Sequence, residues 1–249
     1  MDLGLQGRVA VVTGGASGIG AATALGLARE GCDVAVVDVR FGGAADHVLE
    51  GIRAAGRRAL RVEGDVRDAA FGARGIGRIV AEMGRVDILV CAAGITADAV
   101  CWKMTPAQWD DVIAVNLTGC FHWNRAAASV LRERGWGRIV NIASINGLRG
   151  KAGQANYAAS KGGMVALSKS LAKELGRSGV TVNVVAPGMV KTPMTAPLAD
   201  RFVEAAIDES AVGRIAEPED CASAVAWLCS ESARHVTGQV LKVDGGQYV

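Results

Sequence analysis

The stretch "RVAVVTGGASGIGAATALGLAREG" (residues 8–31) decides the fold. A short apolar run, a glycine cluster and an Ala-rich segment of helical length follow one another, which predicts a strand, a tight turn and a helix. Gly14, Gly18 and Gly20 let the backbone turn sharply and approach an anionic ligand, toward which the helix directs its free N–H groups. Their G-x3-G-x-G spacing differs from the G-x-G-x-x-G dinucleotide fingerprint, and a glycine cluster alone is a weak signal.

The same alternation of short β-branched runs and longer Ala-rich runs continues along the 249 residues. Most of the apolar runs are nearly continuous, as in parallel strands that are covered on both faces. This pattern predicts an α/β protein: a single-domain Rossmann fold over residues 1–249, whose doubly wound, seven-stranded parallel sheet carries helices on both faces. The predicted strands are 8–13, 33–38, 58–64, 86–91, 138–143, 180–186 and 239–243.

Composition excludes several classes of protein. The net charge is only +2, which argues against nucleic acid or an anionic membrane as a partner. The six cysteines form no CxxC pair and the three histidines lie far apart, so we expect reduced thiols and no metal site. The chain shows no signal peptide and no apolar run long enough to cross a bilayer, which predicts a cytoplasmic protein.

The second predicted strand ends in Asp38, eighteen residues after Gly20. A carboxylate at this place can accept hydrogen bonds from the adenosine ribose hydroxyls, and its charge would repel a 2′-phosphate. Ser17 stands in the glycine turn where a basic side chain could have met that phosphate. We therefore expect NAD rather than NADP as the cofactor. Arg40 argues against this expectation, because it lies only two positions beyond Asp38 and its charge would favour a 2′-phosphate.

A second stretch, "SINGLRGKAGQANYAASKGG" (residues 144–163), spaces Ser144, Tyr157 and Lys161 among small residues. Tyr157 and Lys161 are four residues apart in a helical pattern, so their side chains share one face. A free tyrosine titrates near pH ~10, and a neighbouring cation is expected to lower the pKa of the phenol. Ser144 follows a predicted strand and can hold a carbonyl oxygen while Tyr157 moves its proton.

Together, these residues closely resemble the short-chain dehydrogenase/reductase family. The resemblance implies direct hydride transfer between a nicotinamide and a carbonyl or secondary alcohol, without a metal. Its catalytic residues here are Asn116, Ser144, Tyr157 as the general acid/base, and Lys161, with Asn116 linked to Lys161 by a water-mediated proton path. The matching motifs are "TGGASGIG" (13–20), "GDV" (64–66), "AAG" (92–94), Asn116 in "VNLTG", Ser144, "YAASK" (157–161) and "APGMVKT" (186–192).

The resemblance also implies which residues bind the cofactor. One departure is "CAAG" (91–94), where the family often has N-N-A-G; we expect a cost in stability or cofactor affinity, and we interpret Cys91 as a small buried hydrophobe. The implied cofactor-binding residues are Gly14, Ser17, Gly18, Ile19, Gly20, Asp38, Asp65, Val66, Ala92, Gly94, Tyr157, Lys161, Pro187, Gly188, Val190 and Thr192.

For the substrate, the chain looks most like reductases of 3-oxoacyl thioesters carried on acyl carrier protein or coenzyme A. An NAD-dependent dehydrogenase of a secondary or cyclic alcohol or polyol is the alternative, and a non-catalytic dinucleotide-binding sensor or scaffold is a second one. The long segment 188–213 after a strand end predicts a substrate lid. Trp102 is a further pocket candidate, and the predicted substrate-binding residues are Ser144, Asn146, Gln154, Tyr157, Met189 and Met194.

Two expectations concern partners. The resemblance implies a homotetramer with the helices around 106–134 and 155–177 and the C-terminal "VDGGQYV" at its interfaces. An acidic or phosphorylated acyl carrier needs basic side chains near the cleft, although a solvated helix face explains a run of arginines equally well. The arginines concerned are Arg125, Arg132, Arg134 and Arg138.

Overall fold

A computed structural model describes residues 2–249 and contains one seven-stranded, all-parallel sheet of order β3-β2-β1-β4-β5-β6-β7. All seven predicted strands are confirmed, with ends that differ from the prediction by at most two residues. The chain runs outward from β1 to β3 and then returns to place β4 on the other side of β1. The strands are β1 (Val9–Thr13), β2 (Asp33–Asp38), β3 (Ala59–Glu63), β4 (Ile88–Cys91), β5 (Gly137–Ile142), β6 (Val180–Pro187) and β7 (Val240–Val243).

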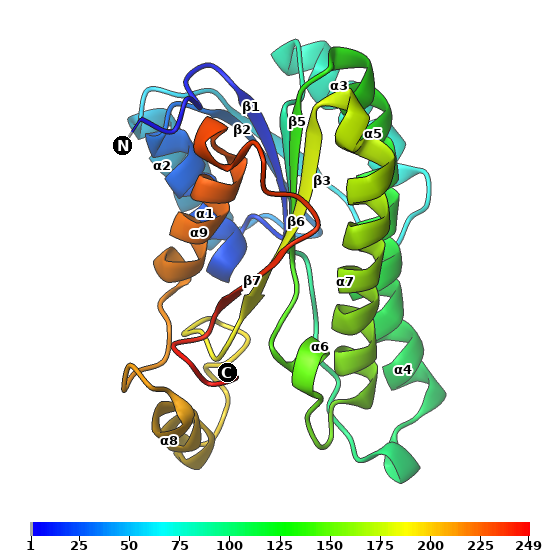
Figure 1. Cartoon of the computed structure of the whole chain (residues 1–249), viewed down its shortest axis with the longest axis vertical. Helices are drawn as coiled ribbons and strands as arrows, with labels where there is room; N and C mark the ends of the chain where they lie inside the picture. The colour runs from blue at the N-terminus through cyan, green and yellow to red at the C-terminus, as the bar shows by residue number, and fades with distance from the viewer. Residues whose placement is uncertain (1) are drawn as a thin grey trace.

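Helices cover both faces of the sheet (Figure 1). On one face α1 packs against α2 and α9, and on the other α5 packs against α3 and α7. Two short helices, α6 and α8, lie beyond the carboxyl ends of the strands (Figure 1). The helices are α1 (Gly18–Arg29), α2 (Gly43–Ala54), α3 (Phe71–Met83), α4 (Pro106–Ile113), α5 (Cys120–Arg134), α6 (Asn146–Arg149), α7 (Ala155–Leu175), α8 (Asp200–Glu209) and α9 (Pro218–Cys229).

The central strands are apolar along their whole length because each face of the sheet has its own core. In β1, Val9 and Val11 face the core under α3, α5 and α7, whereas Ala10 and Val12 face the core under α1, α2 and α9. Side chains of a strand alternate between the two faces, so a strand that is covered on both sides requires an apolar residue at every position.

At the amino edge of the sheet, the fully buried carboxylate of Asp87 joins the starts of two strands. It accepts a hydrogen bond of 2.9 Å from the Val9 nitrogen and two of 2.6 Å from the Arg85 guanidinium. Arg8 and Arg134 lie 3.5 and 3.9 Å from the same carboxylate. A buried carboxylate needs such partners because its charge has lost its water.

The predicted arginine cluster is divided by the fold, and two of its members lie far from the cleft. Arg134 faces Asp87, and the Arg138 guanidinium stacks 4.3 Å above the Trp136 ring and 3.4 Å from Glu231. Both arginines are at the amino edge because they precede or begin β5, whereas Ser144 follows its carboxyl end. The expectation that they serve a carrier at the cleft is wrong.

We expect Asp87→Ala to destabilise the protein by about 3–5 kcal/mol, because it leaves several guanidinium groups around a buried site without their counter-charge. Equilibrium denaturation in urea measures this difference. Asp208→Ala, at an exposed position of α8, is the matched control and is expected to change the free energy of unfolding by less than about 0.5 kcal/mol. Equal effects of the two substitutions would contradict the role given to Asp87.

Candidate active site

In the glycine turn after β1, Gly14 and Gly20 lie too close to other backbone atoms to carry a side chain. This turn forms a cradle for a ligand. Gly14 has a φ of +66°, and a Cβ on it would lie 2.6 Å from the Ala93 nitrogen; a Cβ on Gly20 would lie 2.1 Å from the Gly14 oxygen. The first turn of α1 contains no acidic residue. Its free N–H groups and positive dipole end therefore favour an anion such as a pyrophosphate.

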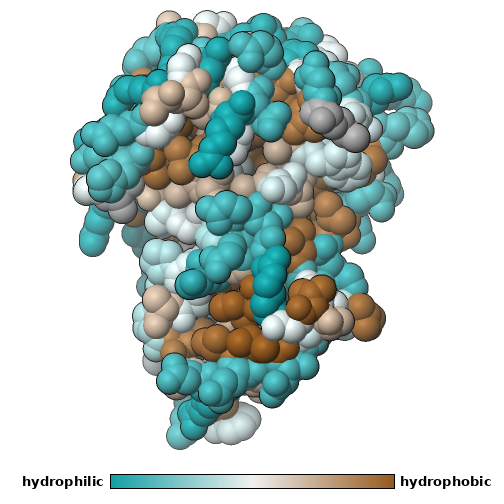
Figure 2. Space-filling view, turned by 90° about the vertical axis from the view of Figure 1, so that its left-hand side faces the viewer, coloured by the Kyte–Doolittle hydropathy of each residue, from teal (hydrophilic) through white to brown (hydrophobic). Residues whose placement is uncertain are grey.

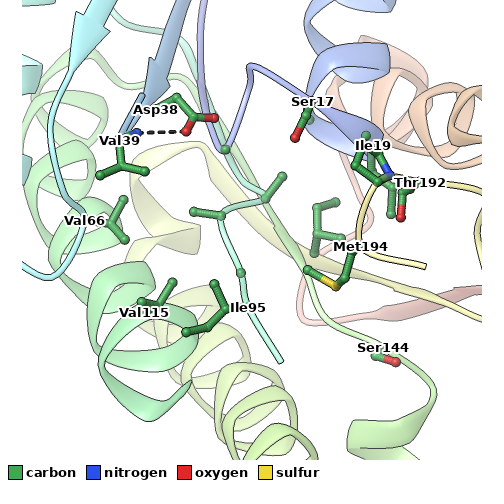
Figure 3. Close-up of a pocket in the computed structure, with 18 of the residues that line it drawn as sticks. Ser17, Ile19, Asp38, Val39, Val66, Ile95, Val115, Ser144, Thr192 and Met194 are labelled. Carbon is green, nitrogen blue, oxygen red and sulfur yellow. Dashed lines mark hydrogen bonds between the residues drawn. The ribbon is translucent and has the colours of Figure 1, made fainter. Parts of the chain in front are cut away.

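A cavity of about 600 Å³ opens from this turn along the carboxyl edge of the sheet. Figure 3 shows Ser17 and Asp38 at one end, Val66 and Val115 along one wall, and Ser144 at the other end. All sixteen residues predicted to bind the cofactor line this cavity. The size is within the usual range for small-molecule sites. The structure thus brings together residues that lie more than 170 positions apart in the chain.

Asp38 lies at the end of β2 and faces this cavity (Figure 3). Its carboxylate accepts hydrogen bonds from the Val39 nitrogen at 2.8 Å and from the Ala16 nitrogen at 3.1 Å. The second bond ties the carboxylate to the glycine turn, so the two features predicted from separate motifs form one unit. Arg40 also lines the cavity, as Asp38 does.

Asn116 does not line the cavity. Its side chain lies behind Ile95, which does line it. Asn116 lies in a π-helical segment, Ala114–Gly119, between α4 and α5, and is fully buried. Its Oδ1 accepts from the Ile95 nitrogen at 2.8 Å, and its Nδ2 donates to the Ile95 oxygen and the Ser160 Oγ. Among residues 2–249 it makes no direct hydrogen bond to Lys161. Single π-helical turns often occur at functional sites.

Tyr157 and Lys161 lie at the end of the cavity near Ser144, but their electrostatics differ from the expectation. The Lys161 Nζ donates a 2.7 Å hydrogen bond to the Ile142 oxygen and lies 5.6 Å from the centre of the Tyr157 ring. Burial raises the pKa of Tyr157 to about 12, while the Ser144 hydroxyl acts in the lowering direction. The net change is opposite to the lowering that we expected, because desolvation of the buried phenol is its largest cause.

Burial also acts on Lys161 itself. Its side chain is only 4% exposed, and desolvation lowers the pKa of its ammonium group to about 8. A buried cation is costly unless it is paired, and no carboxylate of the described chain lies within ion-pair distance of it. A residue kept at such a cost is a candidate for a functional role.

Polar side chains from α5 and β5 lie next to Cys91, the residue that departs from the family motif. The Asn124 Nδ2 lies 3.4 Å from the Cys91 Sγ and donates to the Cys120 oxygen at 2.9 Å and the Asn141 Oδ1 at 3.0 Å. A hydrogen bond with Cys120, followed by burial, raises the pKa of the Cys91 thiol. Cys91 is therefore an inert buried side chain.

A second cavity of about 410 Å³ adjoins the first, and Ser144 and Tyr157 line both. All six predicted substrate-binding residues line it, whereas Trp102 is 82% exposed and lines neither cavity. Figure 2 shows apolar surface gathered in the lower half of the face that carries α8. The exposed large apolar side chains of segment 188–213 are Met194, Leu198, Phe202 and Val212.

Sequence reasoning missed Asp98, Arg149 and Gln247, which line the second cavity. The Gln154 Nε2 donates to Asp98 at 2.8 Å, and Arg149 donates to the Asn146 Oδ1 and to the Gln247 oxygen. No local pattern could have identified them, because Arg149 and Gln247 are 98 positions apart.

Two other kinds of site find no support in residues 2–249. No group of three or more His, Cys, Asp or Glu side chains is arranged to hold a metal ion. Over the same residues, no helix has both the length and the apolar character needed to span a bilayer.

Several known proteins with similar sequences are named as reductases. The family model described as "Enoyl-(Acyl carrier protein) reductase" matches residues 14–247. The chain is 43% identical over 242 residues to an acetoacetyl-CoA reductase of Rhizobium meliloti, covering 97% of this chain and 98% of that protein. It is 41% identical over 243 residues, with the same shares covered, to the 3-oxoacyl-[acyl-carrier-protein] reductase FabG of Staphylococcus aureus. Nodulation protein G of Azospirillum brasilense is 41% identical over 239 residues, covering 96% and 97% of the two chains.

The buried ammonium of Lys161 predicts a pH-dependent stability. Its pKa falls from 10.5 to about 8 on folding, so the unfolded chain binds more protons between these pH values, and wild-type stability rises with pH through this window. We expect Lys161→Met to be more stable than the wild type at pH 7 by roughly 2 kcal/mol, since the lost hydrogen bond offsets part of the desolvation cost. This advantage shrinks toward pH 10.5.

Urea denaturation of both proteins at pH 7 and pH 10 measures the change. Lys169→Met, on the exposed side of the same helix, controls for the loss of a lysine. A stability difference between Lys161→Met and the wild type that is the same at both pH values would contradict the prediction.

Proposed function

This chain belongs to the short-chain dehydrogenase/reductase family and is an oxidoreductase, and from this premise we propose that it transfers a hydride between NAD(H) and the 3-oxo or 3-hydroxy carbon of an acyl thioester. One observation carries the proposal: Ser144 and Tyr157 stand where the two cavities meet. A group there can reach both a cofactor in the larger cavity and a substrate in the smaller one.

The glycine cradle and Asp38 support a dinucleotide in the larger cavity. The turn that Gly14, Gly18 and Gly20 form would hold the pyrophosphate at the start of α1, and Asp38 would accept from the adenosine ribose hydroxyls. Lys161 would bind the nicotinamide ribose. When bound, the nicotinamide supplies or accepts the hydride. The carboxylate favours NAD(H), because a 2′-phosphate beside Asp38 would place two negative charges together.

The chain's own residues then handle the proton. Ser144 would donate a hydrogen bond to the substrate oxygen, and Tyr157 would give its proton to that oxygen in reduction or remove it in oxidation. With a pKa of about 12, Tyr157 rests as the neutral acid, which is the form that reduction needs. The Lys161 charge favours the phenolate that forms when the proton leaves. Asn116 supports the site by holding the Ile95 backbone.

The apolar wall of the smaller cavity supports an acyl substrate. Met189, Met194, Leu198 and Phe202 line it, and two of the similar proteins are named as reductases of acetoacetyl-CoA and of 3-oxoacyl carrier protein. A cyclic alcohol or polyol is less well matched, because a polyol would leave hydroxyl groups against this wall without partners. The arrangement of acid, serine and lysine also argues against an idle dinucleotide-binding protein.

We further propose that segment 188–213 is a substrate lid on a single domain. It joins β6 to α9, contains α8, and contributes Met189, Met194 and Phe202 to the smaller cavity. Lids of this kind exclude water from a reaction and commit the substrate.

A homotetramer is the assembly we propose. Trp109 in α4 and Phe121 in α5 are each 41% exposed, and both lie in the range 106–134 that the family resemblance assigns to an interface. Exposed large apolar side chains on one layer are typical of protein contacts. Light scattering during size-exclusion chromatography measures the assembly; a monomer at micromolar concentration would contradict it.

Tyr157→Phe is expected to lower kcat for acetoacetyl-CoA reduction by at least about 100-fold, because the ring keeps its packing and loses the proton. NADH affinity, measured by calorimetry, is expected to stay within about threefold of the wild type, which checks that the cofactor cavity is intact. Substantial turnover by the variant would overturn the assignment of Tyr157.

Initial rates with acetoacetyl-CoA test the cofactor preference, using NADH and NADPH in parallel. We expect the wild type to prefer NADH and Asp38→Ser to shift the ratio of kcat/KM toward NADPH by at least about fivefold, since removal of one charge near a phosphate is worth about 1 kcal/mol or more. A wild type that already prefers NADPH would contradict the role of Asp38 and turn attention to Arg40.

A further inference from the structure

One wall of the smaller cavity is a continuous chain of polar side chains with a charged group at each end. The Gln154 Nε2 donates to the Asp98 carboxylate at 2.8 Å, and the Asn146 Nδ2 donates to the Gln154 Oε1 at 3.0 Å. The Arg149 Nε donates to the Asn146 Oδ1 at 3.3 Å. Asn146, Gln154, Asp98 and Arg149 all line the cavity.

The charged ends leave only one orientation for both amides. An ionised carboxylate can only accept hydrogen bonds, so Gln154 must turn its NH2 group toward Asp98 and its oxygen toward Asn146. A guanidinium can only donate, so Asn146 must turn its oxygen toward Arg149 and its NH2 group toward Gln154. Both requirements agree. Flipping either amide would set two donors or two acceptors against each other.

This orientation leaves N–H groups without partners in the cavity wall. Each amide NH2 carries two hydrogens, and the chain uses one from Gln154 and one from Asn146; over residues 2–249 no other acceptor takes the second. An unpaired N–H is more costly in a site closed to water than an oxygen with a spare lone pair. The wall therefore favours a ligand that presents an acceptor oxygen.

We propose that Asp98 and Arg149 are positioning residues, which orient Gln154 and Asn146 so that these two amides donate hydrogen bonds to a second oxygen of the substrate. Both amide residues line the same cavity as Ser144 and Tyr157. The backbone nitrogen of Asn146 donates to the Ser144 Oγ at 3.1 Å, and Gln154, the N-cap residue of α7, precedes Tyr157 by three residues.

The inference deepens the proposed function and rests on it. In a 3-oxoacyl thioester, the thioester carbonyl is an acceptor two carbons away from the carbonyl that is reduced. A simple ketone has no such oxygen. The amides thus select 1,3-dicarbonyl substrates. Arg149 also donates to Glu209 of α8 at 3.0 Å, so the orientation of this wall depends on the seated lid segment.

Ethyl acetoacetate and 2-heptanone test the proposal, since the two ketones have chains of equal length and only the first has the second carbonyl. Their kcat/KM values are measured with NADH for the wild type and Gln154→Met, which preserves the size of the side chain. We expect the variant to lose about tenfold in kcat/KM for ethyl acetoacetate, as for one lost hydrogen bond, and to stay within about twofold for 2-heptanone. Gln239→Met, at an exposed position of the described chain, is the control.

Asp98 supplies the test of positioning. Asp98→Ala removes the acceptor that orients Gln154, and we expect most of the preference for ethyl acetoacetate to be lost. Asp98→Asn retains an oxygen that can accept from Gln154 and is expected to restore most of that preference. A structural role alone would lower the rates for both ketones together and leave their ratio unchanged.

The outcomes separate the two proposals. If the wild type reduces both ketones without preference, or if Gln154→Met lowers both rates equally, the inference on Asp98 and Arg149 is overturned while the oxidoreductase assignment stands. If the wild type reduces neither ketone nor acetoacetyl-CoA, the proposed function is overturned and this inference falls with it. A selective loss in Gln154→Met and Asp98→Ala, restored in Asp98→Asn, supports it.

Discussion

At the carboxyl edge of the sheet, the turn after β1 touches the turn after β4 so closely that a Cβ on Gly14 would lie 2.6 Å from the Ala93 nitrogen. The chain reverses its direction of winding between these two strands, and ligands of open α/β sheets bind at such a point. The contact brings the start of α1, the end of β2 and the loop held by Asn116 around one cavity. Without a bare backbone at residue 14 the two turns would separate, and the cradle for an anion would be lost.

The site contains two ionisable groups whose charged forms are penalised by burial. Desolvation lowers the pKa of Lys161 to about 8 and raises that of Tyr157 to about 12, so in both residues the charged form is penalised. Within residues 2–249, the Lys161 ammonium donates one hydrogen bond, to the Ile142 oxygen, and its burial lowers stability at neutral pH. In the proposed function this buried cation would stabilise the negative charge that develops on Tyr157. Asp87 shows the contrast at the opposite edge, where a buried charge is fully paired and serves the fold.

The two cavities are formed by different combinations of segments. The larger one is built from strand ends, the first turn of α1 and part of the segment that follows β6. The smaller one combines α6 and the start of α7 with segment 188–213 and the C-terminal residues. Gln247 joins these parts, because its side chain accepts from the Met189 nitrogen and donates to the Ala206 oxygen. Gln247 thus links the proposed lid to Arg149 of the polar wall.

The sequence by itself determined the strands, the alternation of helices, the glycine turn and the spacing of Ser144, Tyr157 and Lys161, since these depend on local periodicity and on backbone freedom at glycine. It also pointed to cavity-lining residues wherever a strand ended. Only the tertiary structure decided the orientation of polar groups: Lys161 bonds to Ile142, Asn116 lies behind the cavity, and Asp98 meets Gln154 across 56 positions. Desolvation and hydrogen-bond direction depend on atoms from distant segments, so no local pattern records them.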